Sequence, residues 1–113
     1  MHDFIKVMKA LSDKNRVKIV KMLQYRELCV CEIQNALGVS QPTVSKHLKV
    51  LEHADIVRFR KAGHWTNYFL SGGRKNKYVS AILGNIRHWI NEDPEITELV
   101  ERLPEIRREN ICK

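Results

Sequence analysis

The sequence is poor in the features that mark secreted, membrane-bound or fibrous proteins. Among 113 residues there are three cysteines, three prolines and five glycines, and aromatic residues make up 7%. Three cysteines are too few, and odd in number, for a framework of disulfide bridges. No apolar run approaches the roughly 18 residues of a membrane span, and the N-terminal residues lack the basic flank and apolar stretch of a signal peptide. We therefore expect one globular domain in the cytoplasm, with reduced thiols and no membrane contact.

Negative charge is scarce over most of the chain. Residues 1–90 contain 16 Lys and Arg against 6 Asp and Glu, whereas residues 91–113 contain 4 against 7. The formal net charge at pH 7 is +7. A basic body with a mildly acidic end favours a polyanion such as nucleic acid as the partner of the body.

Apolar side chains recur at helical spacing in four stretches. These positions are Phe4, Val7, Met8 and Leu11; Val17, Ile19, Val20 and Leu23; Val30, Ile33 and Leu37; and Val44, Leu48 and Leu51. Ser12 or Asp13 can cap the second helix, and Gly38 suits the end of the third. Ser40 is a good cap for the fourth helix, with Pro42 in its first turn. The lysines expected to face solvent from the second helix are Lys14, Lys18 and Lys21.

A short β region and a last long helix follow. Residues 56–60 and 65–70 are rich in β-formers, and residues 61–64 suit the turn of a hairpin between them. The apolar positions of the last long helix are Val79, Ile82, Leu83, Ile86, Trp89 and Ile90. We predict a mainly α domain with a small β-hairpin over residues 1–91, and a C-terminal tail with one short helix over residues 92–113.

The third and fourth helices, joined by a tight turn, form a helix-turn-helix pattern. A helix that enters the major groove needs slim hydrogen-bonding side chains for base edges and cations for phosphates. The basic hairpin that follows can act as a wing on the adjacent minor groove or phosphates. A winged helix-turn-helix that binds double-stranded DNA is therefore predicted. The expected contacts are Ser40, Gln41, Pro42, Thr43, Ser45, Lys46, His47 and Lys49 from the helix, and Arg58, Arg60 and Lys61 from the wing.

Residues 3–90 resemble the ArsR/SmtB family of metalloregulatory repressors. The most specific part is the run of Ser40, Ser45, His47, Leu48 and Leu51, and the segment 27–33 and the wing also match. The resemblance implies a homodimer held by the first and last long helices. It also implies binding to an imperfect inverted repeat in an operator.

Cys29 and Cys31 lie where the third helix is expected to begin. Cys29 and Glu32 have the spacing of a capping box, with sulfur in place of a hydroxyl. A thiol there gives up roughly 1 kcal/mol relative to a good cap, which suggests a chemical use. The helix N-terminus is expected to favour the thiolate forms. Residues i and i+2 do not share a helix face, so gripping one ion must distort the first turn and displace the recognition helix.

The Cys-Val-Cys pattern resembles the inducer site of arsenite- and antimonite-responsive members of the family, which implies trivalent arsenic or antimony as inducer. Those members supply a third thiolate three residues after the second, where this chain has Gln34. Cys112 is the remaining candidate, so the predicted ligands are Cys29, Cys31 and Cys112. A solvent oxygen could complete the site instead, or the inducer could be a mono-organic arsenical that needs two thiolates.

Two other readings of the thiol pair stay open. A repressor could sense oxidants through the same cysteines, or the chain could be a small thiol oxidoreductase, although it lacks the βαβ pattern that usually accompanies such motifs. No histidine has a carboxylate and nucleophile arrangement suggesting catalysis. The last long helix carries only His88, so the histidine and carboxylate pairs of zinc- or nickel-sensing relatives are absent. We therefore expect a regulator, with no catalytic residues or catalytic cofactor.

Overall fold

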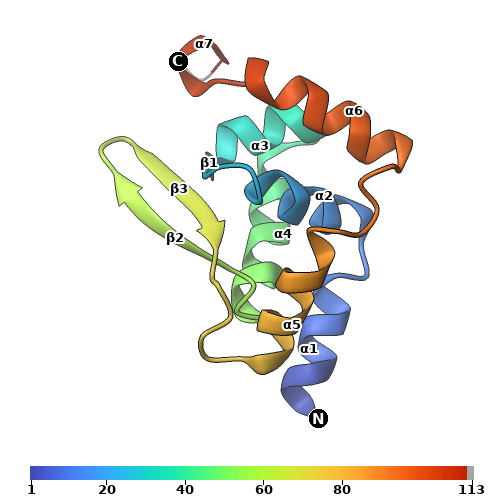
Figure 1. Ribbon diagram of the computed structural model, residues 1–113. Coiled ribbons are helices and arrows are strands. Elements are labelled where there is room, and N and C mark those ends of the chain that lie inside the picture. The colour runs from blue at the N-terminus through green and yellow to red at the C-terminus, as the bar shows by residue number, and fades with distance from the viewer. Residues whose placement is uncertain (112–113) are drawn as a thin grey trace.

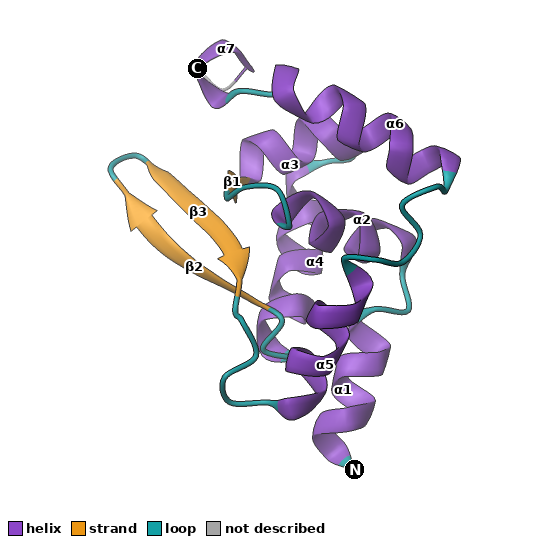
Figure 2. Ribbon diagram, in the orientation of Figure 1, coloured by secondary structure: helices purple, strands orange, loops and turns teal. Residues whose placement is uncertain are grey.

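Helices dominate the computed structural model, which describes residues 1–111 (Figures 1 and 2). The helices are α1 (His2–Ala10), α2 (Lys14–Leu23), α3 (Val30–Leu37), α4 (Gln41–His53), α5 (Lys77–Ile86), α6 (Pro94–Arg102) and α7 (Arg108–Ile111), with a 3-10 turn η1 (Leu103–Glu105). The strands are β1 (Leu28–Cys29), β2 (Val57–Ala62) and β3 (Trp65–Leu70). The predicted class, mainly helical with a small hairpin, is confirmed.

The starts of α2, α3 and α4 and the end of α3 lie at the residues that the sequence indicates. The Asp13 carboxylate caps α2 by accepting the Arg16 backbone N–H at 3.1 Å. The Ser40 hydroxyl caps α4 by accepting the Thr43 backbone N–H at 3.3 Å. Gly38 ends α3 in the left-handed region, at φ 70°, where a residue without a side chain avoids strain. Local capping chemistry therefore fixes the helix-turn-helix.

The hairpin is one part of a three-stranded antiparallel sheet in the order β1-β3-β2. β2 and β3 pair along their whole length, from Val57 opposite Leu70 to Ala62 opposite Trp65. The short strand β1 adds to the other edge of β3, with Cys29 opposite Asn67. Figure 2 shows the tip of the hairpin extending away from the helices. The segment that carries the first thiol is thus bonded directly to the wing.

A single core joins the helix-turn-helix to the base of the wing. Fully buried side chains include Ile19, Ile33, Leu48, Leu51 and Ile56, which come from α2, α3, α4 and the turn before β2. Burying an aliphatic side chain of this size contributes roughly 1.5–3 kcal/mol. The orientation of α4 is therefore set mainly by its apolar stripe, which leaves its polar faces available.

Lys21 departs from the sequence prediction. Its side chain was expected in solvent, yet it is fully buried and donates to Ile86 O at 2.9 Å, Trp89 O at 3.0 Å and Asn91 Oδ1 at 2.7 Å. Burial lowers the pKa of this ammonium group. A cation beside the last carbonyls of a helix complements its dipole.

The last long helix is shorter than predicted. α5 ends at Ile86, and Ile90 adopts a left-handed conformation at φ 55°. Trp89 and Ile90 therefore lie after the helix and not on its stripe. The Ile86 carbonyl, which a continued α-helix would pair with the Ile90 N–H, instead accepts from the Lys21 ammonium group and from the Trp89 backbone N–H at 3.1 Å.

The segment after residue 91 contributes to the same core. Figure 1 shows α6 lying across the end of the molecule that holds α2 and α3. Ile96, Leu99, Leu103 and Ile106 are buried, and Arg102 Nη2 donates to Ala36 O at 2.9 Å. The predicted tail with one short helix thus contains α6, η1 and α7. Within residues 1–111, no helix has the length and apolarity needed to cross a membrane.

Candidate DNA interface and thiol site

The exposed face of α4 carries the side chains predicted to contact DNA. Gln41, Pro42, Lys46 and Lys49 are exposed, and Thr43, Ser45 and His47 are half-buried. The Ser40 hydroxyl lies 2.9 Å from the Thr43 hydroxyl, so both are held at the start of the helix. The arrangement offers small polar groups and two cations from one surface, as base and phosphate contacts require.

His47 has a partner inside the protein. Its Nδ1 accepts a hydrogen bond from Arg16 Nη1 on α2 at 3.2 Å. From the sequence, this histidine is predicted only as a groove contact. The structure adds that one edge of its ring is turned toward α2.

The wing does not present its three predicted cations equally. Arg58, Arg60 and Lys61 are all exposed on β2. However, Arg60 Nη2 pairs with Glu27 Oε1 at 2.8 Å, and its guanidinium lies 5.8 Å from the Phe69 ring centroid. Arg58 and Lys61 are the wing cations with no ion pair among the described residues.

Cys29 is the N-cap of α3 and is 2% exposed. Glu32 Oε1 accepts the Cys29 backbone N–H at 2.9 Å, and the Glu32 backbone N–H faces the Cys29 sulfur, so the predicted capping box is present. Burial raises the pKa of the Cys29 thiol, and the nearby Glu32 carboxylate adds to the increase. The expectation that the helix N-terminus favours thiolate is wrong for Cys29, because desolvation outweighs the dipole.

A hollow of about 290 Å³ joins the thiol-bearing turn to both DNA-binding elements. It is lined by Cys29, Val30, Cys31, Gln34, Gln41, His64, Trp65 and Thr66. Gln41 is the first residue of α4, and the last three residues belong to the end of the wing turn and to β3. A group bound between the sulfurs would therefore lie against the recognition helix and the wing at once.

The structure brings the two sulfur-bearing residues of the Cys-Val-Cys turn to that hollow. The predicted third ligand, Cys112, lies outside the described residues. Gln34 lines the hollow and offers an amide at the position where the inducer-site pattern that this chain resembles has a thiol. Within residues 1–111, no three His, Cys, Asp or Glu side chains are grouped closely enough to hold a metal ion.

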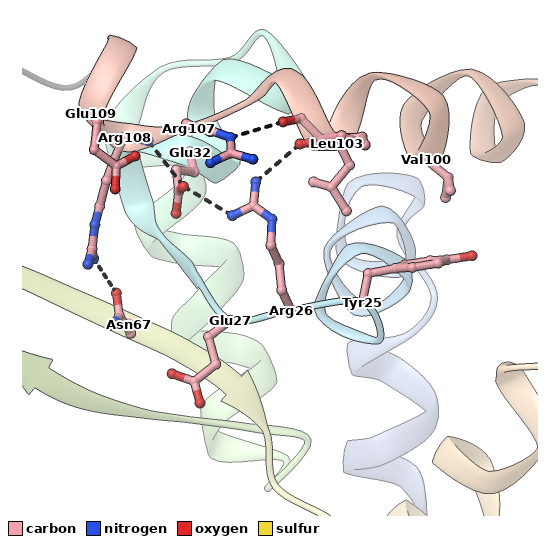
Figure 3. A pocket seen from close by; sticks show the side chains of 11 residues that line it. Tyr25, Arg26, Glu27, Glu32, Asn67, Val100, Leu103, Arg107, Arg108 and Glu109 are labelled. Carbon is pink, nitrogen blue, oxygen red and sulfur yellow. Dashed lines mark hydrogen bonds and ion pairs between the residues drawn. The ribbon is translucent and has the colours of Figure 1, made fainter.

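Glu32 connects the thiol-bearing turn to the C-terminal segment. Its Oε2 accepts from Arg26 Nη1 at 3.2 Å and from the Arg108 backbone N–H at 3.2 Å. Arg26 also donates to the carbonyls of Leu103 and Ile106. Figure 3 shows Arg26, Glu32, Leu103 and Arg108 around a second hollow, of about 490 Å³, between the end of α2, the wing and the C-terminal segment.

Arg108 extends this network to the wing. Its Nη1 donates to Asn67 Oδ1 at 2.8 Å, and its guanidinium lies 5.0 Å from the Trp65 ring centroid. Asn67 is the residue that pairs with Cys29 across the sheet. The roles of Arg26, Arg108 and Arg16 are not predictable from the sequence, because basic side chains at these positions have no local signal for a specific partner.

Several curated relatives are named for metal or metalloid resistance. The chain is 34% identical to the arsenic resistance transcriptional regulator ArsR1 of Pseudomonas putida, over 85% of this chain and 79% of that protein. It is 43% identical to the arsenical resistance operon repressor of Escherichia coli, over 59% of this chain and 58% of that protein. It is 45% identical to a homologue of the cadmium resistance regulator CadC of Staphylococcus aureus, over 60% of this chain and 57% of that protein. The chain thus spans little more than half of the latter two.

Solved structures with the same fold include transcriptional regulators. HlyU from Vibrio cholerae superposes with a TM-score of 0.67 at 28% identity, covering 79% of this chain and 92% of that chain. The homodimeric winged helix-turn-helix DNA-binding domain of Mb0332 from Mycobacterium bovis superposes with a TM-score of 0.67 at 25% identity, covering 80% of this chain and 81% of that chain. The model of the arsR family of bacterial regulatory proteins matches residues 13–58. The chain therefore belongs to the arsR family, and it is a transcriptional regulator with a winged helix-turn-helix fold, not an enzyme.

Proposed function

We propose that this protein is a cytoplasmic homodimeric repressor that binds an imperfect inverted repeat in operator DNA. Trivalent arsenic or antimony binds the thiols of Cys29 and Cys31 and releases the repressor from the operator. The observation that carries the proposal is the hollow that Cys29 and Cys31 share with Gln41 of α4 and Trp65 of the wing.

The mechanism follows from the burial of Cys29. Because Cys29 is 2% exposed, we expect its sulfur to reach a centre shared with Cys31 only if the first turn of α3 opens. Opening that turn breaks the contacts between Cys29 and Glu32. It also pulls on the β1–β3 pairing at Asn67. The recognition helix, which packs on α3, and the wing are then displaced together.

The chemistry of capture is a ligand exchange. Each thiol that attacks arsenous acid forms one As–S bond, and its proton leaves with one hydroxyl of the acid as water. Two thiols leave one hydroxyl on the arsenic, and a third thiolate, with Cys112 as the candidate, would displace it. The raised pKa of the Cys29 thiol keeps this group protonated at neutral pH. We therefore expect capture to become faster as pH rises toward that pKa, because the thiolate is the attacking form.

Operator binding and release test the proposal directly. A DNA fragment selected by the protein from a random pool is labelled, and binding is followed by fluorescence anisotropy. We expect tight binding by the parent protein and release by arsenite. For Cys29→Ser and Cys31→Ser, unchanged operator affinity and at least a 100-fold higher arsenite requirement are expected, because one thiolate cannot chelate the ion.

Three further arms separate the alternatives. Cys112→Ser tests the third ligand, and a parent-like arsenite response from it removes Cys112 from the site. Gln34→Cys supplies a thiol at the position of the resembled pattern and should lower the arsenite requirement. Release by peroxide but not by arsenite or antimonite would assign the thiols to redox sensing, and the absence of DNA binding in every state would refute the repressor.

The proposed dimer interface is the face that α1 shares with α5 and the residues following α5. Phe4 and Ile5 of α1 are exposed, as are Trp89 (51%) and Ile90. Phe4 also packs edge-to-face on Tyr78 of α5, with ring centroids 5.4 Å apart. Large apolar side chains left exposed on neighbouring elements such as α1 and α5 are typical of an interface. In a homodimer with a two-fold axis, each of these side chains would occur twice in the interface.

Trp89→Glu is expected to weaken dimerisation by 100-fold or more, because the two-fold axis places the substitution in the interface twice. Sedimentation equilibrium across a concentration series measures the change. Tyr25→Glu is the matched control, since Tyr25 is another exposed aromatic side chain (59%) at the end of α2. Equal dissociation constants for the two variants would contradict the proposed interface.

A further inference from the structure

Arg16 on α2 contacts two neighbouring helices through three donors. Its Nε donates to Ala10 O at 2.7 Å and its Nη2 to Lys9 O at 3.3 Å, both at the end of α1. Its Nη1 donates to His47 Nδ1 on α4 at 3.2 Å. The α1 carbonyls hold the guanidinium in place, so the orientation of the group that meets His47 is fixed from outside the recognition helix.

That contact determines the tautomer of His47. A guanidinium stays charged and has only N–H donors, so the ring nitrogen that faces it must be the acceptor. The Nδ1 lone pair of His47 therefore points to Arg16, and the ring proton of the neutral imidazole lies on Nε2. The half-buried ring is thereby held with a defined donor on its other edge.

We propose that Arg16 is a positioning residue that locks His47 as the Nε2–H tautomer, so that α4 presents a hydrogen-bond donor to DNA at this position. The inference rests on the proposed operator binding. A donor selects acceptors, which are guanine N7 and O6, adenine N7, thymine O4 or a phosphate oxygen. It opposes the exocyclic amino group of cytosine, which is itself a donor.

The tautomer is measured first, on the DNA-free protein labelled with ¹⁵N-histidine. Long-range ¹H–¹⁵N spectra at pH 8, where imidazole is neutral, distinguish the two tautomers by the pattern of ring couplings. We expect His47 to show the Nε2–H pattern in the parent and a mixture of both patterns in Arg16→Met. A predominant Nδ1–H pattern in the parent overturns the proposal whatever the protein does with DNA.

Operator selection then tests the reading step. For the parent we expect one base position at which acceptor-rich edges are enriched. That preference should be lost in His47→Ala, with affinity about 10-fold lower, and relaxed in Arg16→Met. A uniform loss of affinity with no change in base preference assigns the donor to a phosphate. An unchanged preference and affinity in both variants overturns the proposal, and Lys49→Ala controls for the loss of any polar side chain from α4.

Discussion

Gly73→Ala is expected to lower the free energy of unfolding by about 4 kcal/mol. Gly73 adopts φ +71°, and a Cβ built on it would lie 2.5 Å from both the backbone N and the Cα of Ser80. The left-handed conformation costs a residue with a side chain roughly 1–2 kcal/mol, and overpacking against backbone adds roughly 1–3 kcal/mol. Urea denaturation followed by circular dichroism measures the change.

The neighbouring glycine supplies the control for this substitution. Gly72 also has a positive φ, of +81°, but nothing lies within 4 Å of the position of its Cβ. Gly72→Ala should therefore cost about 1–2 kcal/mol from the backbone alone. Equal losses for the two variants would mean that the close approach of residue 73 to α5 does not contribute, and that the base of the wing is held in another way.

Lys21→Ala is expected to lower the free energy of unfolding by about 4 kcal/mol as well. The substitution leaves a cavity where a fully buried four-carbon chain had packed. It also removes the donor shared by the carbonyls of Ile86 and Trp89. Because those carbonyls belong to the segment that presents Trp89, dimerisation should weaken with stability. Denaturation and sedimentation on the same samples test both effects.

Two variants separate packing from hydrogen bonding at this lysine. Lys21→Met keeps most of the volume and loses the charge, so about 2 kcal/mol is expected. Lys14→Ala, an exposed position on the same helix that pairs with Glu95 at 2.9 Å, should change stability by less than about 0.5 kcal/mol. If Lys21→Ala lowers the free energy of unfolding no more than Lys14→Ala does, the buried ammonium group of Lys21 does not stabilise the fold.

The pH dependence gives an independent check on Lys21. Burial lowers the pKa of its ammonium group in the folded protein, so the unfolded chain holds this proton more tightly. The contribution of Lys21 to the free energy of unfolding therefore rises as the pH increases from the pKa of its ammonium group in the folded protein toward the pKa of the same group in the unfolded chain. In Lys21→Met this alkaline rise should be missing. An identical pH profile for parent and variant would contradict the assignment.

Local sequence patterns determined the helix-turn-helix and the wing. Asp13, Ser40 and Gly38 fix helix ends by contacts within a few residues, so their effect is readable from the sequence. The β-formers on either side of residues 61–64 predicted the hairpin for the same reason. The cysteine and glutamate spacing at the start of α3 likewise predicted the capping box that the structure contains.

Contacts between distant residues decided the rest. From the sequence, Lys21 is expected on the surface; in the folded protein it meets the last carbonyl of α5 and the Trp89 carbonyl after it, 65 and 68 positions along the chain. From the sequence, the helix N-terminus is expected to activate the Cys29 thiol. In the folded protein, burial raises the pKa of this thiol instead. The sequence indicates no partner for Arg16 or Arg60, which meet His47 and Glu27 only in the folded protein. Side-chain periodicity in the sequence specifies which face of a helix is buried. The desolvation and charge pairing of a side chain depend on how distant segments pack, and only the tertiary structure shows that packing.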